Sequence, residues 1–204
     1  ILAPDDLGSA FPIDDALASS WDAYRSGNLV AALGRYPTGR QPAASAEHLY
    51  LAALLLSVGS VESAEAHLNA ATSDPRLHPL IEAHRDLINI VRFGPSARAS
   101  AQGADPTGNR AEVIGRTATG LLAESYSLQA ATQLREARDR ARAAVTLAPS
   151  SGIAWTRLAE LEFSLGRRRP ADDALARGLD ASPDHAAAHA LRGFTLAAGN
   201  RVRE

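Results

Sequence analysis

The chain has 204 residues, of which about a fifth are alanine, 5% are aromatic and 22% are charged. Its formal net charge is −2, and all 21 basic residues are arginines interspersed with acids, so we expect no uniform positive field that would hold nucleic acid or an anionic bilayer. Cysteine is absent, which excludes disulfides and thiolate metal sites and leaves the cellular compartment open.

The first half of the chain predicts paired helices. Alanine-rich, helix-periodic segments dominate, and clusters of Val, Ile and Thr bounded by turns are absent. Residues 14–36 predict a first pair with Gly27 at the turn, and residues 45–72 predict a second pair with Gly59 at the turn. A glycine suits each turn because it tolerates a left-handed backbone.

The middle and the second half follow a less regular order. Residues 76–93 predict a single helix, with no partner helix at the usual distance. No apolar period runs through 96–109, so we expect an exposed, mobile spacer there. Further helices are predicted over 111–131, 134–147, 152–182 as a pair, and 184–198. We therefore expect N-terminal repeats over 1–93, a spacer over 94–110, and C-terminal repeats with a truncated last unit over 111–204, in one continuous solenoid.

The interval between two prolines carries a family resemblance. Pro149 and Pro183 lie 34 residues apart, and between them stand, at the spacing of a helix-turn-helix unit, Trp155, Leu158, Ala159, Gly166, Ala171 and Gly178. The chain resembles a bacterial tetratricopeptide-repeat (TPR) protein, most clearly over residues 118–200 and 45–75. The resemblance implies an all-α fold of antiparallel helix-turn-helix repeats, stacked into a right-handed α-solenoid with Trp155 as a large core side chain.

The resemblance also implies a function and a set of site residues. TPR proteins bind a peptide or protein partner in the groove lined by the first helix of each unit, and the family implies no catalysis. Matching groove positions here are Leu122, Tyr126, Gln129, Thr156, Glu160 and Phe163, with Thr119, Ile153 and Ser164 beside them. Aromatic side chains such as Tyr126 and Phe163 contribute most to recognition when they are partly exposed. The alternative is that they pack against the next repeat.

For several other polar residues we expect a structural role instead of a role in binding. Glu162 stands where the family has a tyrosine, and we expect an ion pair with a residue such as Arg192. Arg157 is expected to be a solvated or ion-paired surface residue, with an acidic ligand group as the alternative. His185 and His189, four residues apart, could form a two-histidine metal edge, but His189 takes the position of Trp155 in the preceding unit, so no metal site is predicted.

No enzymatic motif is present. A phosphate loop needs a lysine that the chain lacks, and there is no Gly-x-Ser-x-Gly or His-Glu-x-x-His motif. We expect no catalytic residues, no cofactor and no membrane insertion, since no window approaches about 20 apolar residues. Two functions remain open: a scaffold or adaptor of a larger multidomain protein that binds a protein partner in its groove, or a structural spacer or dimerisation module without a groove ligand.

Overall fold

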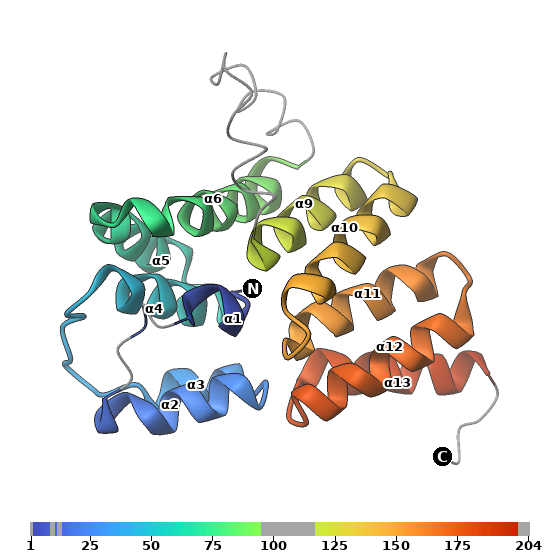
Figure 1. Ribbon diagram of the computed structural model, residues 1–204, viewed down its shortest axis with the longest axis horizontal. Helices are drawn as coiled ribbons and strands as arrows, with labels where there is room; N and C mark the ends of the chain where they lie inside the picture. The colour runs from blue at the N-terminus through green and yellow to red at the C-terminus, as the bar shows by residue number, and fades with distance from the viewer. Residues whose placement is uncertain (1, 9–10, 12–13, 95–116, 200–204) are drawn as a thin grey trace.

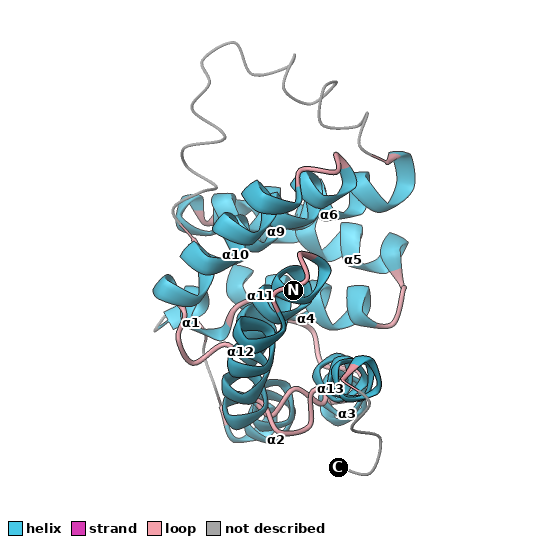
Figure 2. Ribbon diagram, turned by 90° about the vertical axis from the view of Figure 1, so that its right-hand side faces the viewer, coloured by secondary structure: helices cyan, strands magenta, loops and turns pink. Residues whose placement is uncertain are grey.

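Helix-turn-helix pairs make up most of the structure (Figure 1). The computed structural model describes residues 2–8, 11, 14–94 and 117–199. Within these residues there are helices and loops but no strand, as Figure 2 shows. The α-helices are α1 (Pro4–Leu7), α2 (Asp15–Arg25), α3 (Leu29–Arg35), α4 (Ser45–Ser57), α5 (Val61–Ala70), α6 (His78–Phe93), α9 (Ala118–Ala130), α10 (Leu134–Leu147), α11 (Gly152–Ser164), α12 (Arg168–Ala181) and α13 (Ala186–Ala198).

Neighbouring helices pack in antiparallel pairs that follow one another around the molecule. The pairs are α2 with α3, α4 with α5, α9 with α10, and α11 with α12, while α13 packs on α12. Helix α6 is the exception, because it packs mainly on α9, which follows after residues 95–116, and only slightly on α5. The fold is the predicted right-handed α-solenoid of helix-turn-helix repeats. The predicted spacer lies outside the described residues, except for Gly94 at the end of α6.

The turns between paired helices share one backbone conformation. Gly27, Gly59 and Gly166 have positive φ angles of 90°, 77° and 74°. Thr132 occupies the same place between α9 and α10 with φ 63°, 34 residues before Gly166. A β-branched residue in this region is strained, so Thr132 keeps the turn at an energetic penalty that the glycines avoid.

A hydrogen bond repeated 34 residues later confirms the register of the last units. Trp155 Nε1 donates to the carbonyl of Pro149 at 2.8 Å, and His189 Nε2 lies 2.7 Å from the carbonyl of Pro183. The expectation that Trp155 is a core side chain holds only in part: it packs against the buried residues of the C-terminal half, but it is half-buried and lies beneath the guanidinium of Arg177 at 4.9 Å. The indole stays at the surface because its N–H reaches the loop that precedes α11, rather than the space between helices.

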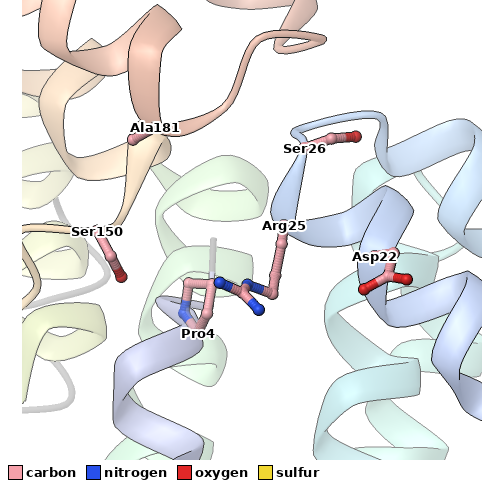
Figure 3. Close-up of a pocket in the computed structure, with 6 residues that line it drawn as sticks. All are labelled: Pro4, Asp22, Arg25, Ser26, Ser150 and Ala181. Atoms are coloured by element: carbon pink, nitrogen blue, oxygen red, sulfur yellow. The ribbon is translucent and has the colours of Figure 1, made fainter.

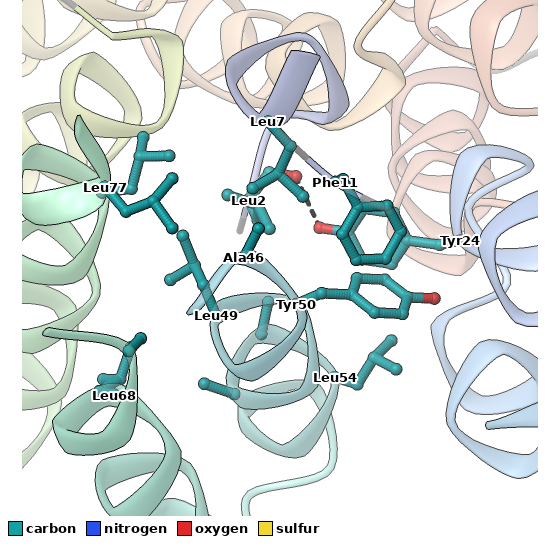
Figure 4. Packing of buried hydrophobic residues seen from close by; sticks show 14 of the residues in the cluster. Leu2, Leu7, Phe11, Tyr24, Ala46, Leu49, Tyr50, Leu54, Leu68 and Leu77 are labelled. Atoms are coloured by element: carbon teal, nitrogen blue, oxygen red, sulfur yellow. Dashed lines mark hydrogen bonds between the residues drawn. The ribbon is translucent and has the colours of Figure 1, made fainter. Parts of the chain in front are cut away.

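The hydrophobic core has two main clusters, one in each half of the chain. The N-terminal cluster contains an aromatic group in which Tyr50 lies about 5 Å, ring centre to ring centre, from each of three other rings, those of Phe11, Trp21 and Tyr24. Figure 4 shows Phe11, Tyr24 and Tyr50 of this group. The C-terminal cluster is built from leucines and from alanines such as Ala141 and Ala159, which are fully buried. Small side chains allow these helices to approach closely.

The two ends of the helical array touch. The amide of Asp184 donates to the carbonyl of Ser26 at 2.7 Å, and Ser182 Oγ donates to the carbonyl of Arg25 at 2.8 Å. A Cβ atom at Gly27 would lie 2.7 Å from the Cβ of His185, so this closing contact requires a glycine. The turn of the first helical pair therefore rests on the loop before α13.

Candidate functional site

The N-terminal segment of the chain lies inside the ring of helical pairs. Figure 1 shows α1 in the centre, with α4 and α9 beside it. The side chains of Leu2 and Leu7 are 0% and 2% exposed, and Leu2 belongs to the N-terminal core cluster, whereas Ala3 belongs to the C-terminal cluster. Residues 2–7, which we call the inner segment, thus connect the two halves of the molecule from within.

A carboxylate of the inner segment caps a distant helix. Asp6 Oδ1 accepts from the amide of Ala118 at 3.0 Å, and Oδ2 accepts from the amide of Thr119 at 2.6 Å. The side chain of Thr117 accepts from the next amide, that of Gly120, at 3.0 Å. The first amides of a helix have no partner within it and carry a partial positive charge, so Asp6 stabilises the start of α9.

The backbone of the inner segment is recognised as well. The amide of Ala3 donates to Thr119 Oγ1 at 2.9 Å, and the hydroxyl of Tyr24 donates to the carbonyl of Leu2 at 2.6 Å, the bond drawn in Figure 4. Burial raises the pKa of Tyr24 well above its usual range, so the phenol stays a donor. Ser150 Oγ lies 2.8 Å from both carboxylate oxygens of Asp5. Each half of the array contributes to these contacts.

A cavity of about 260 Å³ opens beside the inner segment, where the two ends of the array meet (Figure 3). Arg25 extends into it from α2, and within the described chain its guanidinium makes no ion pair or hydrogen bond. The lining residues are Pro4, Asp22, Arg25, Ser26, Ser150 and Ala181. The cavity therefore offers one cation and several hydroxyl or carboxylate groups next to the segment.

Three of the predicted site residues lie on α9. Leu122 is fully buried in the C-terminal core cluster. Tyr126 is half-buried, its ring lies 3.7 Å from the guanidinium carbon of Arg157, and burial raises its pKa to about 12. Gln129 is half-buried near the end of the helix. Of the three, Tyr126 and Gln129 reach the surface.

The other three lie on α11. Thr156 is buried, donates to the carbonyl of Gly152 at 2.8 Å and lies 3.1 Å from His185 Nδ1. Glu160 is half-buried and pairs with Arg157 at 3.1 Å, and Phe163 is half-buried. The structure thus brings Tyr126 and Glu160 together around one arginine and leaves Leu122 and Thr156 inside the packing between helices.

Of two expectations about charged residues, the one for Arg157 is wrong and the one for Glu162 is confirmed with other partners. Arg157 is 3% exposed, not a surface residue, and it donates to Ser125 Oγ at 2.9 Å and to the Ser125 carbonyl at 3.1 Å. Glu162 is buried and forms the expected ion pair with arginine, but its partners are Arg142 at 2.8 Å and Arg167 at 3.1 Å instead of Arg192. Arg142 comes from the preceding helix, α10, whereas Arg192 is exposed on α13.

The histidines do not gather into a metal centre within the part of the chain that the structure describes, where no three potential ligands lie together. His48 and His67 form a half-buried pair with their Nδ1 atoms 2.9 Å apart, and burial lowers the pKa of His67. His84 is fully buried with Nδ1 at 2.7 Å from the Leu80 carbonyl, and burial lowers its pKa to about 3. The imidazole of His84 is therefore neutral at pH 7. No described helix combines the length and the apolar character needed to cross a bilayer.

The role of residues 2–7 has only a weak signal in the sequence. Leu2, Leu7 and Phe11 are apolar residues spaced four or five apart, ahead of the first helix that periodicity predicts. This spacing could have indicated a buried segment. Nothing in the sequence pairs Asp6 with an amide 112 residues away.

Comparison with protein families and with curated proteins gives no match. Among solved structures, the chain is similar to a chain in the crystal structure of the APC/C hetero-tetramer Cut9-Hcn1, with a TM-score of 0.53 and 14% sequence identity. The match covers 87% of this chain and 35% of that one, so the present chain spans about a third of its length. This likeness concerns the fold, which is that of a TPR solenoid.

Proposed function

We propose that this domain is a non-enzymatic scaffold or adaptor, part of a larger multidomain protein, which binds a peptide or protein partner on the inner side of its helical array. The observation that carries the proposal is the inner segment itself. Backbone groups of Leu2 and Ala3 and the carboxylate of Asp6 are held by side chains and amides of the repeats, as a bound peptide would be. A surface that holds one short segment in this way has the donors and apolar contacts to hold another.

The half-buried aromatic residues support the same proposal. Tyr126 and Phe163 lie on α9 and α11, the first helices of their pairs, and both residues are half-buried, Tyr126 against α6 and Phe163 against the C-terminal core cluster. Partly exposed aromatic side chains in a groove are frequent centres of binding energy. We expect the partner to contact these two residues and Gln129 and Glu160 beside them.

A display library of short peptides, selected on the immobilised full chain, tests the proposal. Selected peptides should bind the wild-type chain and lose about 10-fold or more in affinity for Phe163→Ala. Phe194→Ala is the matched control, because Phe194 is 67% exposed on α13, away from these residues, and its loss should leave affinity unchanged. Failure to select any peptide, or equal losses for both variants, would contradict the proposal.

The alternative is a spacer or dimerisation module, and one observation favours it. Helix α13 exposes Phe194 together with Ala190 and Ala197, an apolar surface at the end of the array. Sedimentation of the wild-type chain and of Phe194→Ala separates the two functions. A concentration-dependent dimer that Phe194→Ala abolishes, with no peptide selected, would favour the alternative.

A further inference from the structure

We infer that the inner segment is an internal ligand: the surface that holds it recognises a short acidic segment with apolar ends, and a partner carrying a segment of that chemistry takes its place. The inference deepens the proposed function and rests on it. It states the chemistry of the partner, and it identifies the inner segment as the competitor that the partner must displace.

The inner segment contacts the repeats as a ligand does. Helix α1 belongs to no helix-turn-helix pair, and it has four residues, too few to be stable alone. The position of the inner segment depends on hydrogen bonds to residues far away in the sequence. The partners Tyr24, Thr119 and Ser150 follow the segment residues that they bind by 22, 116 and 145 positions. These residues stand outside the helix-turn-helix pairs, yet Leu2 and Leu7 fill positions in the N-terminal core cluster.

The contacts define which segment fits. Two amides at the start of α9 bind the two oxygens of one carboxylate, that of Asp6, and one of these bonds and the negative charge are lost if one oxygen becomes an amide nitrogen. Leu2 and Leu7 fill apolar sites on either side of the acidic pair, since both are at most 2% exposed. A fitting partner therefore carries two apolar residues about five positions apart, with an aspartate directly before the second.

The charge around the segment agrees with an acidic ligand. Arg25 lines the cavity next to Pro4 and makes no ion pair with the residues that the structure describes. Asp22 lines the same cavity, so the lining outside the segment carries one negative and one positive charge, and the guanidinium of Arg25 is the group that can pair with a carboxylate of an occupying segment. A partner segment with a further acidic group would pair with Arg25, a contact that the inner segment itself does not make.

A competition experiment on the full chain tests the inference. The probe is a fluorescent peptide with the sequence of residues 1–8, measured by anisotropy. Asp6→Asn in the chain removes the charge that two amides bind, so the inner segment is held less tightly and the probe should bind this variant about 10-fold or more tighter than the wild type. A probe that carries asparagine at the position of Asp6 should lose about 10-fold or more on the same variant.

Asp5→Asn is the matched control, because it makes the same charge change one residue away. Asp5 is exposed, and among the described residues its carboxylate is bound by the Ser150 hydroxyl alone, so its replacement should alter probe affinity by less than about 3-fold. Circular dichroism must show unchanged helix content in both variants. Should Asp6→Asn lose helix content, Leu7→Ala in the chain serves as the second variant and should also strengthen probe binding.

Each result decides between the alternatives. Equal probe affinity for wild type, Asp6→Asn and Leu7→Ala would overturn the inference, and the proposed function would still stand if library peptides bind elsewhere on the chain. Absence of binding by both probe and library peptides would overturn both. A concentration-dependent dimer that the probe dissociates would overturn the partner assignment, because the occupant would be the inner segment of a second copy.

Discussion

Replacing Gly152 by alanine should destabilise the chain, because there is no room for a Cβ atom between α11 and the end of α12. The added atom would overlap the Cβ and Oγ of Ser182 and lie 2.7 Å from the carbonyl oxygen of Gly178. Overpacking of this kind costs about 1–3 kcal/mol. A shift of Ser182 would also weaken its hydrogen bond to the carbonyl of Arg25, which contributes about 1 kcal/mol. We expect a loss of about 2–3 kcal/mol in the free energy of unfolding.

Gly193→Ala is the matched control for this substitution. Gly193 lies inside α13, and no atom comes within 4 Å of the Cβ that alanine would add. Alanine should therefore stabilise the helix by roughly 0.5–1 kcal/mol. Urea unfolding followed by circular dichroism measures both variants. If the two substitutions shifted the unfolding midpoint in the same direction, the close contact between α11 and the end of α12 would be refuted.

Three further predictions have defined outcomes. Burial lowers the pKa of His84 from 6.5 to about 3, so below pH 6.5 the unfolded chain binds a proton that the folded chain does not. The free energy of unfolding therefore decreases as the pH is lowered. Urea titrations from pH 7 to 4.5 should show that His84→Gln flattens this decline by up to about 1.4 kcal/mol per pH unit; an unchanged slope would contradict it. Arg142→Ala and Arg167→Ala should each cost about 1 kcal/mol, but together more than their sum, because the double variant leaves the buried Glu162 unpaired; additive thermal unfolding data would contradict this. Thr132→Gly should raise the free energy of unfolding by roughly 0.5–1 kcal/mol by relieving a positive φ, and a lower melting temperature would show that the turn is not strained.

Local patterns in the sequence were sufficient to predict the repeats. Glycine at the turn and the 34-residue interval are properties of a few neighbouring residues, and the bonds of Trp155 and His189 to the two prolines confirm that register. The sequence did not predict Thr132 as a turn residue, because a threonine side chain disfavours the positive φ angle that the turn requires.

Features that depend on distant pairs could not be predicted. The burial of Arg157 follows from its contact with Ser125, a residue of the preceding repeat, and helical periodicity carries no information about it. Likewise, the contact of Ser26 with Asp184 depends on how far the whole array curves. A small rotation accumulates over every repeat, so this curvature is set by the packing of all of them.

Cross-linking in this cysteine-free chain tests the central claim most directly, namely that residues 2–7 occupy the inner side of the array. Cysteines at Asp5 and Ser150, whose side chains are in contact, should be bridged within one chain by a short bis-maleimide. Cysteines at Asp5 and Ser164 should not, because Ser164 lies at the far end of α11, about 18 Å along the helix from Gly152. Mass spectrometry of the digested monomer should find the first cross-link in most molecules; unbridged cysteines, or equal bridging of both pairs, would contradict the claim.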